Sequence, residues 1–307
     1  AVPTTELIEN KCYPTKDAEG NVKFWKKHER RAGLSPIVAN LFGLYGNFTL
    51  ELKKKLKDYL SSTGIKKIIC TYDKIDKLME FINPKDFKLT IDEYHNFLKQ
   101  YSFRDKAING VLAHFKEFKS YCFLSATPIP NNLKPAIFND IPEYMADWNT
   151  TDEITVYPYH TNKPYMVAAK FIKTYQAKGC LNVNGIESKE AYFFINSVTE
   201  IKAILKQTQL TEDDYRIICA DNPKNRRTLE GYTISSSADA PKKFNFITSK
   251  SFEGVDFHSE TGLCFVVSNV QNRHTLVSID MDIPQIVGRI RTKSNPFRNK
   301  VVHIFNT

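Results

Sequence analysis

The sequence lacks several features that would assign a class of protein at once. Its six cysteines form no Cys-x-x-Cys pair, and its seven histidines show no spacing typical of metal ligands. These absences argue against a zinc site and against a disulfide framework. Four cysteines lie in short apolar runs, where buried free thiols are expected: Cys70, Cys122, Cys219 and Cys264.

Long apolar runs are also missing. No run is long enough to span a bilayer, and the N-terminus lacks the charged-then-apolar order of a signal peptide. We therefore expect a cytoplasmic protein without a membrane partner.

The composition is that of a globular chain, with 42% apolar and 25% charged residues in 307 positions. This length allows two domains, each with its own core. The net charge of +9 favours a polyanionic partner.

Apolar periodicity predicts an alternation of strands and helices. Strands are expected at 65–71, 87–92, 121–124, 191–196, 215–220, 244–248, 263–268 and 301–305, and helices at 6–11, 50–60, 73–81, 105–118, 165–177 and 198–207. The intervening stretch 128–163 is rich in proline, which is typical of a domain junction. The pattern predicts two α/β halves, residues 1–150 and 151–307, each with a mostly parallel sheet flanked by helices.

Two adjacent carboxylates, Asp92 and Glu93, end the predicted strand 87–92. Ligands of open α/β sheets collect at the carboxyl ends of strands. A magnesium nucleotide would relieve the repulsion between the two acids, with one acid holding the metal and the other activating water. The alternative is a strand end whose acids face solvent.

Residues 23–31 read Lys-Phe-Trp-Lys-Lys-His-Glu-Arg-Arg. Cations interleaved with aromatic rings suit a nucleic-acid surface, because cations meet phosphates and rings stack on bases. A solvated basic loop explains the same residues, so both interpretations stay open.

Two stretches of the second half complete the set of motifs. Residues 248–256 place a hydroxyl-rich loop, a glycine and an acid after a strand, and residues 285–291 follow Pro284 at an expected helix start. The arginines of the second stretch could reach a phosphate as bidentate donors.

In order, these motifs resemble the series of superfamily-two helicases and translocases, the DEAD/DEAH-like group. Asp92-Glu93-Tyr94-His95 is similar to the DExH form of motif II, and Ser125-Ala126-Thr127 matches motif III. The remaining matches are Val2-Pro3-Thr4 (motif Ia), Thr71-Tyr72-Asp73 (motif Ib), 192–197 (motif IV), 248–256 (motif V) and 285–291 (motif VI). The resemblance implies two RecA-like domains with an ATP cleft between them.

The resemblance also implies roles for single residues. Asp92 would hold Mg²⁺ and Glu93 would activate the attacking water, while His95 and Gln285 would sense ATP. Arg289 would be an arginine finger, and Arg291 stands one position before Thr292, where many relatives carry a second arginine. Ser125 and Thr127 would couple hydrolysis to movement. Gly254, Asp256 and Gly288 would line the nucleotide site, and Pro3, Thr4, Thr71, Ser197 and Thr248 would contact the nucleic-acid backbone.

One motif of the series is absent from the sequence. No Gly-x-x-x-x-Gly-Lys-[Ser/Thr] loop occurs, and the resemblance places that phosphate-binding loop just before motif Ia, upstream of Ala1. We therefore expect these residues alone to hydrolyse ATP poorly.

The resemblance favours the motor core of an ATP-dependent helicase or translocase. The alternatives are a non-catalytic helicase-like module that binds nucleic acid or a protein partner, and the translocase part of a restriction or recombination enzyme. The Asp-Glu-x-His form favours DNA modestly over RNA, and the oligomeric state stays open.

Overall fold

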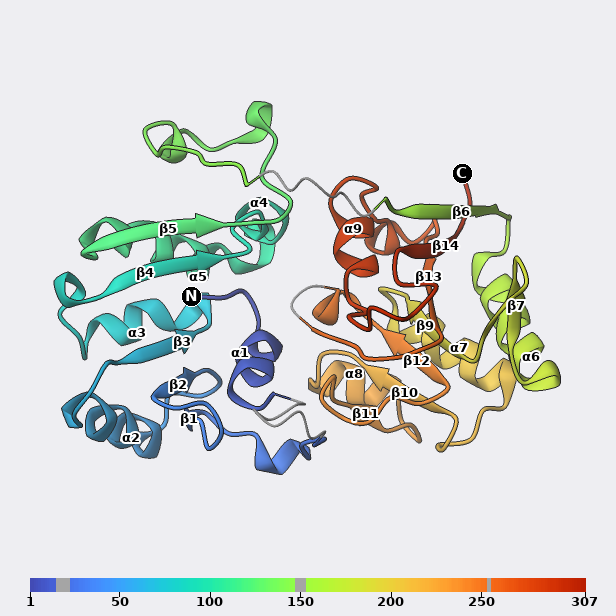
Figure 1. The fold of residues 1–307 in the computed structure, drawn as a ribbon, viewed down its shortest axis with the longest axis horizontal. Helices are drawn as coiled ribbons and strands as arrows, with labels where there is room; N and C mark the ends of the chain where they lie inside the picture. The colour runs from blue at the N-terminus through green and yellow to red at the C-terminus, as the bar shows by residue number, and fades with distance from the viewer. Residues whose placement is uncertain (15–22, 147–152, 253–254) are drawn as a thin grey trace. The chain divides into compact units, whose positions relative to one another are not determined.

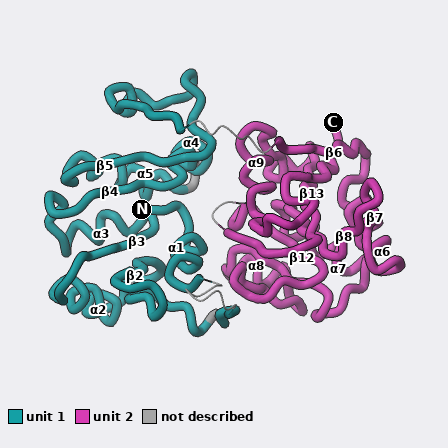
Figure 2. Tube along the Cα trace, viewed as in Figure 1, with its two compact units in different colours: residues 1–149 teal, residues 150–307 magenta. Residues whose placement is uncertain are grey.

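The computed structural model describes residues 1–14, 23–146, 153–252 and 255–307. The chain forms two compact units, unit 1 (Ala1–Asn149) and unit 2 (Thr150–Thr307), each of which is described by itself (Figure 2). In the described ranges, no helix is long and apolar enough to cross a membrane.

Unit 1 is built from short strands and helices. Its strands are β1 (Gly33–Leu34), β2 (Leu41–Leu44), β3 (Lys67–Cys70), β4 (Lys88–Asp92) and β5 (Ser120–Leu124). Its helices are α1 (Thr5–Cys12), α2 (Leu50–Ser61), α3 (Ile75–Met79), α4 (Asn96–Lys99) and α5 (Tyr101–His114). The predicted helix 73–81 is instead a 3₁₀ turn followed by the five-residue α3, and the predicted strand 65–71 is shortened because Ile65 is exposed.

The start of the chain connects the two small sheets of unit 1. β2 is parallel to β3 and antiparallel to β1, while β4 is parallel to β5. Val2 forms a parallel bridge with Thr71, and the Ala1 carbonyl accepts the Asp92 amide at 2.9 Å. Figure 1 shows the N-terminus between β3 and β4. The segments that end β3, β4 and β5 therefore approach one edge together with residues 1–4.

One apolar cluster holds unit 1 together. The stripe of α2 buries Leu52, Leu56 and Tyr59, and α5 buries Ile108 and Val111 in the same cluster. Both helices thus face the core along the side that their apolar spacing predicts.

β5 departs from the sequence prediction. Four of its five residues are exposed, including Cys122, so the expectation of a buried thiol is wrong at this position. The reason is that β5 pairs only with β4 within the described part of unit 1, which leaves its second edge uncovered. The other three cysteines of the apolar runs are buried and free: Cys70, Cys219 and Cys264.

Unit 2 contains a seven-stranded sheet in the order β11-β10-β12-β9-β13-β14-β6, in which every neighbouring pair is parallel. The strands are β6 (Thr155–His160), β9 (Glu190–Phe194), β10 (Tyr215–Ile218), β11 (Ile234–Ser235), β12 (Phe244–Ile247), β13 (Gly262–Val267) and β14 (Lys300–Phe305). β7 (Leu181–Val183) and β8 (Ile186–Ser188) form a separate hairpin. The helices are α6 (Pro164–Lys178), α7 (Val198–Thr208), α8 (Pro223–Thr228) and α9 (Asp282–Val287).

Alternate residues of this sheet enter two different cores. Phe193 and Phe265 stack with centroids 4.7 Å apart on the face that α6 and α7 cover. Tyr192 and Phe194 belong to the cluster on the opposite face, which also contains Ile286 of α9. Because both faces are buried, the strands read as nearly continuous apolar runs, which made them predictable.

Candidate functional site

The predicted site residues of unit 1 gather at the carboxyl ends of its strands. Asp92 is the last residue of β4, Ser125 directly follows β5, and Thr71 directly follows β3. The Tyr94 amide donates to the Leu124 carbonyl at 3.1 Å, which ties the loop after β4 to the end of β5. The parallel register of the sheet thus places motif II beside motif III.

Glu93 adopts a left-handed backbone conformation with a φ of 54°. Such a conformation costs an L-residue about 1–2 kcal/mol, and strain of this kind clusters at functional sites. Four hydrogen bonds hold the turn. The Tyr72 hydroxyl donates to the Asp92 and Glu93 carbonyls, Asn96 Nδ2 donates to the Glu93 carbonyl at 3.2 Å, and the Glu93 amide donates to Asp92 Oδ1 at 3.1 Å. The surrounding structure therefore fixes the backbone position from which the Glu93 side chain extends.

His95 is 1% exposed and lies at the centre of a small polar cluster. Its Nδ1 is 2.7 Å from Ser125 Oγ and 3.4 Å from both Thr127 Oγ1 and Glu93 Oε2. Ser125 Oγ also accepts the Thr127 amide at 3.0 Å. One imidazole nitrogen thus meets an acid of motif II and both hydroxyls of motif III.

Motifs Ia and Ib lie beside this cluster and make structural contacts. Thr4 caps α1, with its Oγ1 accepting the Leu7 amide at 3.4 Å, and the Pro3 carbonyl accepts Arg104. Thr71 is buried, and its hydroxyl hydrogen-bonds the Asp73 carboxylate. Burial raises the pKa of Asp73, but hydrogen bonds from Lys74 and Thr71 outweigh that effect and lower it.

Motif VI lies at the end of a helix, so the expectation of a helix start is wrong. α9 begins at Asp282, and Pro284 therefore stands inside its first turn, where a missing backbone donor is tolerated. Gly288 caps the helix at its C-terminal end, and a Cβ there would meet the Pro284 carbonyl at 3.2 Å.

Arg289 is buried against the end of α9, with 6% exposed. Its Nε donates to the Gln285 carbonyl at 2.7 Å, its Nη2 lies 3.2 Å from Gln285 Oε1, and its Nη1 lies 3.3 Å from the Val255 carbonyl. Motifs V and VI therefore form one cluster in unit 2.

The same two motifs also pair through backbone and charge. The Phe257 amide donates to the Arg289 carbonyl at 2.7 Å, and the Arg291 amide donates to the Phe257 carbonyl at 2.9 Å. Arg291 Nε contacts Asp256 Oδ1 at 2.7 Å, but both side chains are about half exposed, which limits this ion pair to about 0–1 kcal/mol. Gly254 lies outside the described residues.

Motif IV contains a residue that the sequence reasoning missed. Asn196 Nδ2 donates to the His274 carbonyl at 2.6 Å, and its Oδ1 accepts the Ser249 amide at 3.2 Å, so one amide joins the loops after β9, β12 and β13. Ser197 caps α7, and Thr248 is buried with its hydroxyl on the Ile218 carbonyl. An asparagine directly after a buried strand was the available signal.

The donor set around Asp92 fits a magnesium ion in part. Carboxylate oxygens are the ligands that Mg²⁺ prefers, and two acids stand together at this strand end. The described residues contain no group of three or more His, Cys, Asp or Glu side chains that could hold a metal ion. Any Mg²⁺ at Asp92 would take its remaining ligands from phosphate and water, as magnesium at nucleotide sites does.

Several solved structures share the α/β fold of this chain. Saccharomyces cerevisiae Dbp5 bound to RNA and ADP BeF3 matches all of this chain with a TM-score of 0.54 and 11% identity, over 70% of the Dbp5 chain. The Mycobacterium smegmatis helicase Lhr, bound to ssDNA and AMP-PNP, matches 88% of this chain (TM-score 0.52, 10% identity). Mss116p, bound to ssRNA and AMP-PNP, matches 99% (TM-score 0.52, 13% identity).

These matches confirm the predicted fold, a pair of RecA-like α/β domains, and the resemblance to superfamily-two helicases at the level of fold. This chain spans 35% of the Lhr chain and 58% of the Mss116p chain. No protein-family model and no curated protein sequence matches this chain.

Proposed function

We propose that this chain is the motor core of an ATP-dependent nucleic-acid helicase or translocase. The observation that carries the proposal is the contact of 2.7 Å between His95 Nδ1 and Ser125 Oγ, which joins the acids of motif II to motif III. A switch that couples ATP hydrolysis to movement needs such a connection, because the nucleotide state must reach a second segment of the chain.

The residues take the following roles. Glu93 orients and deprotonates the attacking water, and Asp92 supplies an oxygen ligand to Mg²⁺, which neutralises charge on the phosphates when it is bound. Arg289 stabilises charge on the transferred phosphoryl group, and Gln285 holds Arg289 in place. Asp256 and Arg291 help to keep motifs V and VI together.

Nucleic acid is the proposed partner. Dbp5 and Mss116p were solved with RNA and Lhr with ssDNA, so the fold accommodates both polymers. Backbone contacts from the loops that carry Thr4, Thr71, Ser197 and Thr248 would supply affinity without reading sequence. We keep a modest preference for DNA, which competition between oligo(dT) and oligo(rU) would test.

ATP hydrolysis tests the roles of both clusters in a full-length protein, by which we mean one that carries these residues together with a phosphate-binding loop. Glu93→Gln should lower kcat about 10²-fold or more because a general base is lost. Arg289→Ala should lower kcat about 10³-fold or more because an arginine finger is lost. The matched controls, Glu187→Gln and Arg227→Ala, change exposed residues of β8 and α8 and should leave kcat unchanged.

Two results would contradict these assignments. A kcat within twofold of wild type in either site variant, with an unchanged melting temperature, would remove that residue from the mechanism. Brisk, nucleic-acid-stimulated hydrolysis by residues 1–307 alone would refute the expectation that the phosphate-binding loop is required.

A non-catalytic nucleic-acid clamp is the second candidate. The observation that favours it is the burial of Arg289, whose guanidinium already contacts three oxygen atoms of its own unit, two of Gln285 and one of Val255. A clamp predicts that nucleic acid binds equally well with and without ATP, and that full-length protein shows no hydrolysis that Glu93→Gln could remove.

A further inference from the structure

Residues 23–31 are a motif that the proposed function does not use. They lead into β1 and carry five cations, two aromatic residues and one acid. The structure separates these residues into two sets. Trp25 and Arg30 are buried, whereas Lys23, Phe24, Lys26, His28 and Arg31 are exposed.

The buried residues lock the segment onto α1. The Trp25 ring packs edge-on against Tyr13 with centroids 5.4 Å apart, and its Nε1 donates to the Pro14 carbonyl at 3.0 Å. Arg30 Nη1 contacts Glu9 Oε2 of α1 at 2.9 Å. The Arg31 amide donates to the Tyr13 hydroxyl at 3.0 Å. A merely solvated loop needs no such anchors, so the exposed side chains are held in fixed places.

The exposed residues form what we call the loop 23–31 surface: Lys23, Phe24, Lys26, His28 and Arg31. Lys23 Nζ lies 3.7 Å from the centroid of the Trp25 ring, and Phe24 is 44% exposed between the two lysines at 23 and 26. A ring flanked by cations is the arrangement in which a base stacks while its neighbouring phosphates are neutralised.

The positive charge continues onto α2. A Cβ on Gly33 of β1 would lie 3.8 Å from Cδ of Lys55, so this helix runs beside the end of the segment. Lys54, Lys55 and Lys57 are all exposed on α2. Lys55 therefore extends the basic area beyond the loop, and it also pairs with Glu51 of α2 at 2.6 Å.

We propose that the loop 23–31 surface, with the adjoining lysines of α2, binds single-stranded nucleic acid. Single strands are the partner because an exposed ring can stack only on a base that is already unstacked. The proposal rests on the nucleic-acid partner of the proposed function and adds a second contact. Thr4 caps the other end of α1, which at 1.5 Å per residue lies roughly 12 Å away.

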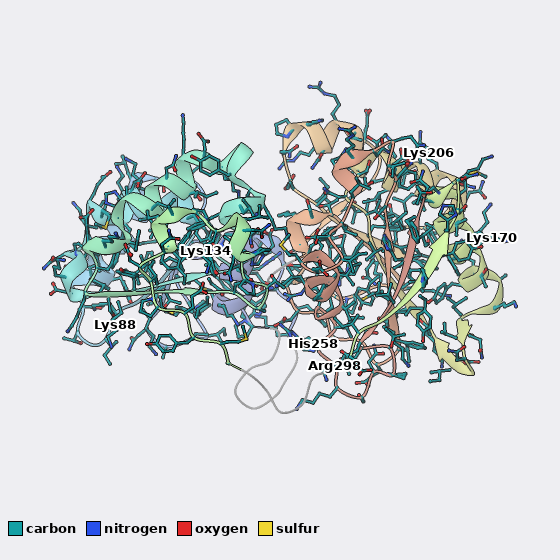
Figure 3. All side chains as sticks on the ribbon, turned by 90° about the horizontal axis from the view of Figure 1, so that it is seen from above. Lys88, Lys134, Lys170, Lys206, His258 and Arg298 are labelled. Carbon is teal, nitrogen blue, oxygen red and sulfur yellow. The ribbon has the colours of Figure 1, made fainter. Side chains whose placement is uncertain are left out.

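Equilibrium binding of fluorescently labelled oligo(dT) and oligo(rU) to the purified chain, without nucleotide, tests the surface. Lys26→Glu with Arg31→Glu should weaken binding about tenfold or more, because two phosphate contacts become repulsive. The control, Lys170→Glu with Lys206→Glu, makes the same change of charge at exposed positions of α6 and α7 (Figure 3) and should bind within twofold of wild type.

Two further variants separate stacking from charge. Lys26→Ala with Arg31→Ala should reduce the slope of log K against log salt by about 1.4, at about 0.7 for each phosphate contact of a single strand. Phe24→Ala should weaken binding about fivefold or more, with an unchanged salt slope, because it removes a stacking ring and no charge.

The outcomes separate this inference from the proposed function. If the wild-type chain binds oligonucleotide and the Lys26/Arg31 variants bind as well as the control, the loop 23–31 surface is not the binding site. The proposed function then still stands. If the wild-type chain binds no oligonucleotide, the proposed function and the binding surface proposed here both lose their nucleic-acid partner. Loss of binding to phosphatidylserine vesicles, with oligonucleotide binding intact, would assign the surface to a membrane and overturn the proposal.

Discussion

Glu93 combines a strained backbone conformation with the proposed role of general base. Its φ of 54° is unfavourable for a residue with a Cβ, and nothing in the side chain relieves that cost locally. The contacts from Tyr72 and Asn96 hold the turn in place instead. A carboxylate at this position is therefore retained against backbone preference, which is typical of a residue kept for function.

A substitution by glycine at position 93 should separate the cost of the backbone conformation from the loss of the carboxylate. Glu93→Gly and Glu93→Ala both remove the carboxylate, but only glycine tolerates a positive φ. We expect Glu93→Gly to be more stable than Glu93→Ala by about 1 kcal/mol, measured by urea unfolding. ATP hydrolysis by the full-length protein should be lost in both. Equal unfolding free energies would show that the left-handed conformation does not constrain the protein in solution.

At the scale of elements, the strands of unit 2 that are buried on both faces were predicted, whereas the short β2 of unit 1 and the edge strand β6 were not. β9, β12 and β13 read as apolar runs because each side chain enters one of two cores. β6 was taken as part of the domain junction, since this edge strand carries Pro158 and leaves most of its residues exposed. The β7–β8 hairpin has Asn184 and Gly185 at positive φ in its turn. It was not predicted because its two strands are short.

Because β14 contains the partly buried His303, we also expect the stability of the chain to depend on pH. Burial lowers the pKa of His303, whose Nε2 lies 3.1 Å from Ser268 Oγ of the loop after β13. The folded chain therefore keeps this histidine neutral, whereas the unfolded chain binds a proton below about pH 6.5. The stability that His303 contributes is present above that pH and is lost as the pH falls through it.

Urea unfolding at pH 7.5 and at pH 5.5 would measure this loss. His303→Gln should reduce the fall in unfolding free energy between the two conditions, while His28→Gln, at an exposed position, should leave it as in wild type. An identical fall in all three proteins would assign the pH dependence to other groups.

At the scale of the whole molecule, the two units differ in how completely they bury their sheets. The sheet of unit 2 has an apolar cluster on each face, whereas β5 of unit 1 leaves most of its residues exposed at an edge. Buried apolar area is the main source of folding free energy. The two units should therefore differ in stability.

Separate expression of residues 1–149 and 150–307 tests this difference. Residues 150–307 should unfold cooperatively at the higher urea concentration, and residues 1–149 should unfold earlier and aggregate more readily through β5. In the intact chain, amide hydrogen exchange should be slower in β9, β12 and β13 than in β4 and β5. Faster exchange in unit 2 would reverse the order that burial predicts.

The sequence by itself determined the α/β alternation, the order of the motifs and the position of Asp92 and Glu93 at a strand end. Apolar period and strand length carry this information locally, so one chain suffices to read it. Only the tertiary structure decided that His95 meets Ser125, that Arg289 contacts the Val255 carbonyl, and that Asn196 joins three loops. These contacts join residues about thirty or more positions apart, and sheet register, rather than spacing along the chain, chooses such partners.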